Sequence, residues 1–559
     1  MTAPADTHLL LRAFVDELAR CGVVGACTSP GSRSTPIVAA LVRDGRIPAW
    51  SHVDERSAAF FAVGLARASG RAAVLVCTSG TAAAHYHPAV IEAWEAGVPL
   101  IVLSADRPPE LRGIAAGQTI DQIGLFGSAA KWFFEVGTHD ATPDRLRWMR
   151  TLACRAFLTA AAQRPGPVHL NMALREPLVL EEALPAQEPG GGGRAGGVPW
   201  VTAAPAPQTP APDLLEPGGS PGVVVAGRSP LVSPQEVADF AAALGWPVLA
   251  DALSGARRGA NAVAHYDALL RDDGFAADHR PQVVVRVGDL PTSKPLRAWL
   301  AGLDARQIAV GWPGPWPDPA GVLDVVAGDA LPRAHAPAPA GWLAAWRAAD
   351  RRAADAIRGA LGDDLGEPLI AADLGALLPR DSTLVVASSM PVRDVETFMA
   401  LREDPPRVLA NRGANGIDGT IATALGVAAA GGGPVVALIG DVALAHDIGS
   451  LAAARRLDVP LTIVLVDNAG GGIFEFLPIA GQADLFEEHI ATPSGIDAEA
   501  VATAFGCAYT LVTDRAGFAA AVAGSLGGQR VEIIHVRTDR KANVGAHRAV
   551  WAAVSAALR

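Results

Sequence analysis

Short runs of apolar residues alternate along this chain with longer stretches in which apolar side chains recur at helical spacing. An uninterrupted apolar run of about four to eight residues is typical of a strand that is buried on both faces, as in a parallel sheet. Strands that alternate with helices predict an α/β fold of doubly wound parallel sheets. The predicted strands are residues 23–27, 73–77, 100–103, 223–226, 283–287, 307–310, 384–387, 435–439, 461–466 and 531–536.

Two segments rich in Pro, Gly and Ala interrupt this pattern. The first covers residues 185–221, with four consecutive glycines and the run Pro205-Ala206-Pro207, and the second covers residues 332–341. Such a composition predicts linkers. The sequence therefore predicts three tandem domains, at residues 1–184, 222–331 and 342–559. A chain of 559 residues is indeed too long for a single core.

The composition narrows the class of protein further. Half of the residues are hydrophobic and 18% are charged, which is typical of a globular protein. The formal net charge of −11 argues against a nucleic-acid partner. An anionic substrate would then have to be bound by a few Lys or Arg side chains grouped at one site.

Three further patterns bear on the compartment. The longest uncharged segment, residues 421–440, contains Gly431-Gly432-Gly433-Pro434, which predicts a helix, a turn and a strand instead of a membrane span. Charged residues run through the first helical stretch, so we expect no signal peptide. The five cysteines are scattered and lack a Cys-x-x-Cys pair, which predicts reduced thiols without zinc or disulfides. We therefore expect a cytoplasmic protein.

In the last predicted domain, residues 342–559, a carboxylate and an amide follow two neighbouring apolar runs. Asp441 follows Gly440, and Asn468 opens the run Asn468-Ala469-Gly470-Gly471-Gly472. Because a helix is predicted between the two runs, both side chains should emerge at the carboxyl ends of adjacent strands, where open α/β sheets bind ligands. Carboxylate, amide and backbone oxygens suit Mg²⁺. Either residue alone fits an ordinary strand-helix-strand crossover, but the pair favours a metal site.

Polar loops also follow the predicted strands of the first predicted domain, residues 1–184. After the first strand, Ser32 and Arg33 lie in a turn that leads into a helix, and a helix start offers unpaired N–H groups to an anion. A capped turn with a solvated Arg33 fits this loop equally well. Glu55 begins another helix, where a carboxylate often merely favours the helix dipole. A second arginine, Arg107, follows a later strand.

With these features the chain resembles the thiamine-diphosphate-dependent decarboxylase superfamily over essentially its whole length. The motifs match most closely the branch that joins 2-oxoglutarate to isochorismate in menaquinone biosynthesis. They are Ser29-Pro30-Gly31-Ser32-Arg33-Ser34-Thr35-Pro36, Asp54-Glu55-Arg56, Thr78-Ser79-Gly80-Thr81-Ala82, Ser104-Ala105-Asp106-Arg107-Pro108, Asn411-Arg412-Gly413, Gly416-Ile417-Asp418-Gly419 and Asp467-Asn468-Ala469-Gly470-Gly471-Gly472-Ile473-Phe474.

The resemblance implies thiamine diphosphate as the cofactor, with Mg²⁺ or Mn²⁺ held by Asp441, Asn468 and Gly470. Glu55 would be the catalytic residue, because its carboxylate would hydrogen-bond the aminopyrimidine ring and support acid–base catalysis through the cofactor. In this superfamily the two halves of the site meet across a subunit interface, which implies a homodimer or a dimer of dimers. The implied cofactor contacts are Glu55, Ser79, Gly80, Thr81, Ser389, Met390, Ile417, Gly440, Asp441, Val442, Asn468, Gly470, Gly471, Ile473 and Phe474.

The implied reaction is the decarboxylation of 2-oxoglutarate followed by addition of the succinic semialdehyde unit to isochorismate. Both substrates are dicarboxylates, which would need several cations near the carboxyl ends of the strands. The implied substrate residues are Ser32, Arg33, Arg107, Gln118, Lys294, Arg393 and Arg412, with Ile473, Phe474 and Leu477 as an apolar wall. Those three apolar residues also fit a plain core.

Two alternatives stay open at this point. The first is an acetolactate-synthase-like enzyme or another 2-oxo-acid decarboxylase with the same cofactor, although pyruvate chemistry needs fewer cations. The second is a non-catalytic regulatory protein that retains the fold. The presence of Glu55, Asp441 and Asn468 together argues against it, because a protein without catalysis has no physical need for all three.

Overall fold

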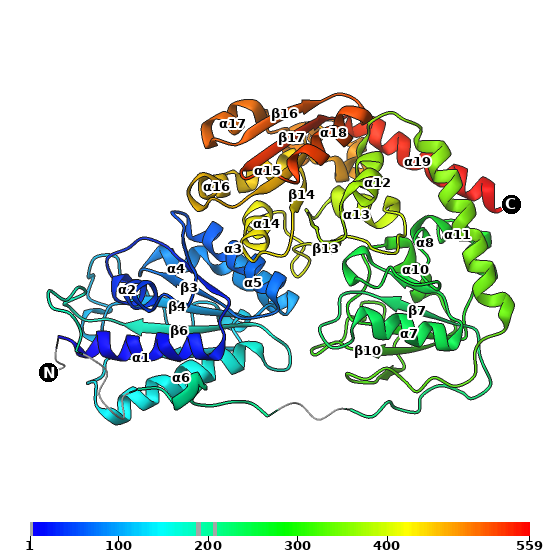
Figure 1. Ribbon diagram of the computed structural model, residues 1–559. Coiled ribbons are helices and arrows are strands. Elements are labelled where there is room, and N and C mark those ends of the chain that lie inside the picture. Colours follow the sequence, from blue (N-terminus) through cyan, green and yellow to red (C-terminus); the bar gives the residue numbers. More distant parts are fainter. Residues whose placement is uncertain (1–3, 186–191, 205–208) are drawn as a thin grey trace.

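The computed structural model describes residues 4–185, 192–204 and 209–559, and across these ranges the chain forms three parallel sheets with helices packed around them (Figure 1). The predicted α/β class with doubly wound parallel sheets is thereby confirmed. Two stretches of the first predicted linker, residues 186–191 and 205–208, lie outside the described residues. The exact domain limits stay predictions.

The first sheet has the order β2-β1-β3-β4-β6-β5. Its strands are β1 (Gly25–Thr28), β2 (Ala49–Ser51), β3 (Ala73–Cys77), β4 (Leu100–Asp106), β5 (Trp132–Glu135) and β6 (Pro167–Ala173). The helices of this part are α1 (Asp6–Cys21), α2 (Thr35–Asp44), α3 (Glu55–Ser69), α4 (Thr81–His85), α5 (His87–Ala96) and α6 (Pro143–Ala161).

The middle sheet has the order β11-β10-β9-β7-β8. Its strands are β7 (Gly222–Ala226), β8 (Val248–Ala250), β9 (Val283–Val287), β10 (Arg306–Val310) and β11 (Val325–Val326). The helices of this part are α7 (Pro234–Leu244), α8 (Tyr266–Leu269), α9 (Asp273–Asp278) and α10 (Lys294–Ala301). The long helix α11 (Ala340–Leu361) starts inside the second predicted linker and runs from the middle part to the C-terminal part (Figure 1).

The last sheet, β13-β12-β14-β15-β17-β16, repeats the strand order of the first. Its strands are β12 (Thr383–Val386), β13 (Arg407–Leu409), β14 (Val435–Gly440), β15 (Leu461–Asp467), β16 (Ala508–Val512) and β17 (Val531–Arg537). The helices of this part are α12 (Glu367–Leu377), α13 (Met390–Phe398), α14 (Thr420–Ala429), α15 (Asp441–Asp447), α16 (Leu451–Leu457), α17 (Ala498–Phe505), α18 (Arg515–Ser525) and α19 (Arg540–Leu558).

All ten predicted strands are present, with ends shifted by a few residues at most. The strands missing from the prediction are β6 and the two edge strands of each sheet. Most edge strands are short and only partly buried; β2, for example, spans three residues with an exposed, half-buried, exposed pattern. In β6 the polar His169 and Asn171 interrupt the apolar run, although both are buried. A search for continuous apolar runs therefore finds central strands and overlooks edges.

The first and last parts share one hydrophobic core. Phe60, Phe61 and Val63 of α3 belong to the same buried cluster as Ile421 and Leu425 of α14. Figure 1 shows these two helices side by side at the junction of the N-terminal and C-terminal parts. This shared core fixes the two sheets relative to each other.

Each of the five cysteines, all of them at described positions, is a free thiol. Residues 421–440 form α14, a turn of left-handed glycines and β14, also as predicted. Among the helices of the described residues, none combines the length and apolarity needed to cross a membrane.

Candidate active site

A cavity of 410 Å³ opens at the carboxyl ends of β12, β14 and β15. Strand β14 ends at Gly440, which pairs with Val466 of β15, so the residues that follow the two strands lie close together. Asp441 is the first residue of α15, and Asn468 directly follows β15. The predicted site residues that line this cavity are Ser389, Met390, Arg393, Arg412, Ile417, Gly440, Asp441, Val442, Asn468, Gly470, Gly471, Ile473 and Phe474.

The oxygens of Asp441 and Asn468 have the environment that a cation would complete. Within the described part of the chain, Oδ2 of Asp441 and Oδ1 of Asn468 are buried and have no hydrogen-bond partner. Burial first, and the neighbouring Asp467 second, raise the pKa of Asp441 to about 6, while backbone N–H groups of Val442 and Gly470 act in the opposite direction. Two unsatisfied buried oxygens beside a loop of backbone carbonyls fit a divalent metal ion with hard oxygen ligands.

Glu367, the first residue of α12, is a part of this site that sequence reasoning missed. Its Oε1 accepts hydrogen bonds from Nδ2 of Asn468, at 2.8 Å, and from the Thr538 hydroxyl, at 3.2 Å. Burial, followed by the charge of Asp394, raises the pKa of Glu367 to about 8. By holding the amide nitrogen, Glu367 leaves Oδ1 of Asn468 free for a metal ion.

The turn before α13 shapes the floor of the cavity. Ser389 has φ 80° and ψ −137°, a strained conformation for a residue with a side chain, and such strain clusters at functional sites. It precedes Met390, the first residue of α13, so the backbone turns sharply at the cavity. The guanidinium of Arg393 donates a hydrogen bond back to the Ser389 carbonyl. The backbone of Ser389, a predicted cofactor residue, is therefore held by one of the predicted substrate cations.

Several basic side chains converge on the same cavity. Arg393 comes from α13 and Arg412 from the loop after β13. Burial, and then the charge of Arg393, lower the pKa of Arg412 to about 10. The predicted Lys294 is exposed at the start of α10, whereas Arg297, one turn later, reaches the cavity together with Thr292. A helix start found from sequence does not reveal which residue of its first turns faces inward.

A second group of predicted residues gathers at the carboxyl edge of the first sheet. The guanidinium of Arg107 donates hydrogen bonds to the Ser79 hydroxyl and, at 3.1 Å, to the Gln118 carbonyl. The Gln118 amide in turn donates to the Ser79 carbonyl at 3.0 Å, and Gly80 N–H donates to Gln122 at 2.9 Å. This network explains why Gln118 lies beside Arg107 although it belongs to an irregular segment.

Arg33 lies near this group and is held by its own partners. It donates a hydrogen bond to the Leu174 carbonyl at 2.9 Å and forms an ion pair with the exposed Glu176 at 3.1 Å. Its charge helps to lower the pKa of Arg107, although burial is the larger cause. Ser32 and Thr81 are exposed at the same edge.

Glu55 lies apart from the cavity that contains Asp441. It is the first residue of α3, where Asp54 caps the helix by accepting a hydrogen bond from Arg56 N–H at 2.8 Å. Glu55 is not among the residues that line the cavity. The predicted substrate residue Leu477 does not line it either, and its side chain is 44% exposed. Within one chain, the predicted site is thus divided between the C-terminal cavity and the edge of the first sheet.

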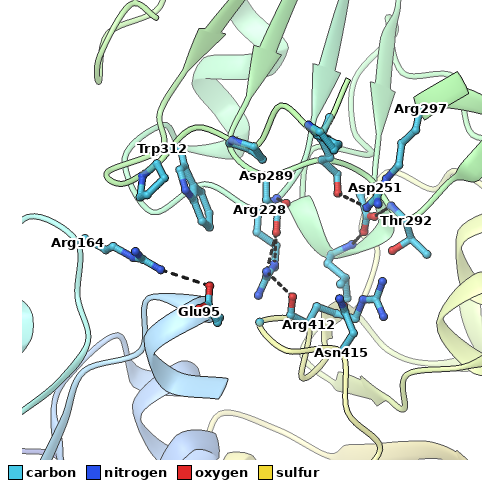
Figure 2. Close-up of a pocket in the computed structure, with 16 residues that line it drawn as sticks. Glu95, Arg164, Arg228, Asp251, Asp289, Thr292, Arg297, Trp312, Arg412 and Asn415 are labelled. Carbon is cyan, nitrogen blue, oxygen red and sulfur yellow. Dashed lines mark hydrogen bonds and ion pairs between the residues drawn. The ribbon is translucent and has the colours of Figure 1, made fainter. Parts of the chain in front are cut away.

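A second cavity, of 330 Å³, adjoins the first and lies where the three parts of the chain meet (Figure 2). Thr292, Arg297, Arg412 and Asn415 line both cavities. Figure 2 shows Arg228 between Asp289 of the middle part and the backbone of Arg412. The loop that carries Arg412 therefore forms the wall between the two spaces.

Comparison with known protein families assigns each of the three parts of the chain. The chain matches the N-terminal TPP-binding domain of thiamine pyrophosphate enzymes at residues 10–125, the middle domain at 198–312 and the C-terminal TPP-binding domain at 391–536. Thiamine pyrophosphate is another name for thiamine diphosphate. These domain matches define a thiamine-diphosphate-dependent enzyme, and the predicted cofactor is confirmed.

Full-length relatives define the family within that class. Proteins of Thermobifida fusca, Geobacillus kaustophilus and Chloroflexus aurantiacus, each named 2-succinyl-5-enolpyruvyl-6-hydroxy-3-cyclohexene-1-carboxylate synthase, are 46%, 42% and 41% identical to this chain. The matches cover 98%, 96% and 99% of this chain and 99%, 96% and 97% of those proteins, in the same order. The chain belongs to the family of 2-succinyl-5-enolpyruvyl-6-hydroxy-3-cyclohexene-1-carboxylate synthases.

Proposed function

We propose that this enzyme decarboxylates 2-oxoglutarate and transfers the remaining four-carbon unit to isochorismate, a step of menaquinone biosynthesis. The observation that supports this reaction best is the cluster of Arg297, Arg393 and Arg412 around the cavity that holds the unsatisfied oxygens of Asp441 and Asn468. Dicarboxylate substrates need several cations within reach of one reacting centre, and guanidinium groups bind carboxylates through paired hydrogen bonds.

Each proposed residue has a distinct task. Asp441, Asn468 and the Gly470 carbonyl would hold Mg²⁺ or Mn²⁺, which neutralises the diphosphate group. Thiamine diphosphate, when bound, supplies the electron sink that decarboxylation requires. The carboxylate of Glu55 would hydrogen-bond a ring nitrogen of the pyrimidine and move a proton at that atom. Ile473 and Phe474 would exclude water from the reacting atoms, because both line the cavity with apolar surface.

A homodimer is the smallest active unit that we propose. Support comes from the division of the site, since Glu55 lies outside the cavity of its own chain. A partner subunit could bring its Glu55 to that cavity, and each of the two sites would then use residues from both chains. Mixing two inactive variants, Glu55→Gln and Asp441→Ala, under subunit exchange should restore activity, because mixed dimers contain one intact site. Absence of any recovery, with exchange demonstrated, would contradict the shared site.

Product analysis tests the reaction itself. Enzyme supplied with thiamine diphosphate and Mg²⁺ should form the combined product, detected by mass, only when 2-oxoglutarate and isochorismate are both present. Release of CO₂ and carboligation with pyruvate alone would favour an acetolactate-synthase-like enzyme instead. Cofactor binding without turnover of any 2-oxo acid would favour a non-catalytic protein.

We also propose that the protein resides in the cytoplasm. The five free thiols support this assignment, because reduced cysteines are typical of that compartment. Fractionation of producing cells, with an antibody against the native chain, tests it; recovery with secreted proteins would contradict it.

A further inference from the structure

The loop between β13 and α14 carries three residues of the candidate cavity, Arg412, Asn415 and Ile417. It belongs to the C-terminal part of the chain, yet groups from the other two parts hold much of its backbone. Arg228 of the middle part donates a hydrogen bond to the Arg412 carbonyl at 3.2 Å (Figure 2). The position of this loop is therefore decided by the packing of separate domains.

Glu92 of α5 makes the most extensive of these contacts. Its Oε1 accepts a hydrogen bond from Gly413 N–H at 3.0 Å, and its Oε2 accepts one from Ala414 N–H at 2.7 Å. The Glu92 side chain is only 3% exposed. A buried carboxylate that accepts two backbone N–H groups forms strong, directional bonds, because the charge strengthens each of them.

Arg67 of α3 completes the contact from the N-terminal part. It forms an ion pair with Oε1 of Glu92 at 3.0 Å and donates a hydrogen bond to the Ala410 carbonyl. The Arg67–Glu92 pair thus holds the backbone on both sides of Arg412. The positive charge of Arg67 and the negative charge of Glu92 offset each other, and both side chains are buried.

The fit between the loop and α5 is close. A Cβ atom on Gly413 would lie 2.6 Å from the Glu92 carbonyl oxygen and 2.8 Å from the Ala96 nitrogen. The loop therefore cannot shift toward α5, and the two bonds to Glu92 oppose a shift away from it. Arg412 leaves this fixed backbone next to Gly413 and reaches the Ser388 hydroxyl at 3.3 Å.

We infer that Glu92 is a positioning residue for the substrate, one that sets the placement of the Arg412 guanidinium from a different domain. The inference rests on the proposed function, in which Arg412 binds a substrate carboxylate. Glu92 itself touches neither cavity. Its effect on catalysis would pass through the backbone of residues 413 and 414.

The test compares Glu92→Gln, Arg412→Ala and the double variant. Arg412→Ala should lower kcat/KM for one dicarboxylate substrate. Glu92→Gln should lower kcat/KM for the same substrate by about tenfold, because an amide has one oxygen to accept a hydrogen bond, and its NH₂ group would face the second backbone N–H. In the Arg412→Ala background, Glu92→Gln should cost less than about twofold, since coupled residues are not additive. The Kd for thiamine diphosphate, measured by calorimetry, should stay within about twofold of the wild-type value.

Glu17→Gln is the matched control, because Glu17 is also a buried carboxylate paired with an arginine, Arg150 at 2.9 Å, and it lines neither cavity. It should leave kcat/KM unchanged. If Glu92→Gln does not fold, Glu92→Asp keeps the charge opposite Arg67 but withdraws the carboxylate from the loop. It should lower kcat/KM for the same substrate.

Two kinds of result would overturn the inference. Multiplicative losses in the double variant, or an unchanged kcat/KM in Glu92→Gln and Glu92→Asp, would show that Glu92 does not act through Arg412. If Arg412→Ala itself changes kcat/KM for neither substrate, the proposed role of Arg412 fails, and the role of Glu92 fails with it.

Discussion

Gly64 of α3 and Gly426 of α14 lie against each other where the N-terminal and C-terminal parts meet. A Cβ atom on Gly64 would lie 2.1 Å from the Thr423 carbonyl oxygen, and one on Gly426 would lie 2.0 Å from the Phe61 carbonyl oxygen. Both helices are in ordinary helical conformation at these positions, so the need for glycine comes from the close approach of the two backbones. The position of Glu55 relative to the C-terminal sheet depends on this contact.

Gly426→Ala should therefore destabilise the protein, because the methyl group would force the two helices apart. Overpacking of this kind typically costs about 1–3 kcal/mol. Gly545→Ala in α19 is the control, since nothing lies within 4 Å of its added Cβ atom. Alanine there should be neutral or stabilise by up to about 1 kcal/mol through helix propensity. Thermal unfolding measures both, and an equal or higher Tm for Gly426→Ala would contradict the close packing.

Glu55→Gln should fold and bind thiamine diphosphate while losing most of its turnover. The amide keeps the shape of the side chain but cannot act as an acid–base group, and loss of such a group typically costs about 10²–10⁴-fold in rate. Steady-state kinetics at saturating cofactor measures the change in kcat, and circular dichroism checks the fold. A variant with nearly normal kcat would remove Glu55 from the mechanism.

Asp441→Ala should abolish activity through loss of metal and cofactor binding. Without this carboxylate the diphosphate would face the sheet edge with too little neutralising charge, so excess Mg²⁺ should rescue poorly. Asp363→Ala is the control, because the Asp363 side chain is 94% exposed and its ion pair with Arg515 lies outside the cavity. Calorimetry with Mg²⁺ and thiamine diphosphate separates the two, and unchanged cofactor affinity in Asp441→Ala would refute the metal site.

Arginines proposed to bind substrate should behave differently from Glu55 and Asp441. Replacing Arg33, Arg107, Arg393 or Arg412 by Ala removes charge-assisted hydrogen bonds worth roughly 1.5–3 kcal/mol, or about ten- to a hundredfold in kcat/KM. Lysine should restore only part of this, because a point charge cannot bind both carboxylate oxygens in the same way.

Cofactor affinity should stay nearly constant across that arginine series. Arg358→Ala is a suitable control, because the Arg358 side chain is 75% exposed and pairs with an equally exposed Asp355. Loss of cofactor binding in every arginine variant, with no change for either substrate, would contradict the dicarboxylate pocket.

Acid should destabilise the fold through His52. This side chain is 2% exposed, and within the described residues neither ring nitrogen has a hydrogen-bond partner. Burial first, and then Arg456, lower the pKa of His52 from its usual 6.5 to about 4. Because His52 binds a proton at higher pH in the unfolded chain than in the folded one, its contribution to the free energy of unfolding is fully present above about pH 6.5. This contribution is lost as the pH falls toward 4.

The expected loss from this one group is roughly 3 kcal/mol across that range. His52→Leu should show a smaller fall in Tm between pH 7 and pH 5 than the wild type does. If Tm fell by the same amount between pH 7 and pH 5 in both proteins, His52 would be excluded as a source of acid sensitivity.

Central strands and the residues that directly follow them could be predicted from the sequence alone. A strand buried on both faces is a continuous apolar run, and a candidate ligand stands within two residues after its carboxyl end. Asp441 and Asn468 were found in this way, and they line one cavity. Strand β6 and the edge strands escaped the prediction, because partial exposure and buried polar residues such as His169 break the apolar pattern.

Tertiary structure alone decided which distant side chains serve the site. Glu367 holds the amide of Asn468, Arg297 takes the place expected for Lys294, and Glu92 holds the loop of Arg412. None of these three residues stands in a local pattern that distinguishes it from an ordinary helix residue. The sequence around a residue determines which face of its own segment is buried, whereas the partner it meets depends on how separate sheets and helices pack. That packing set the division of the site between Glu55 and Asp441 within one chain.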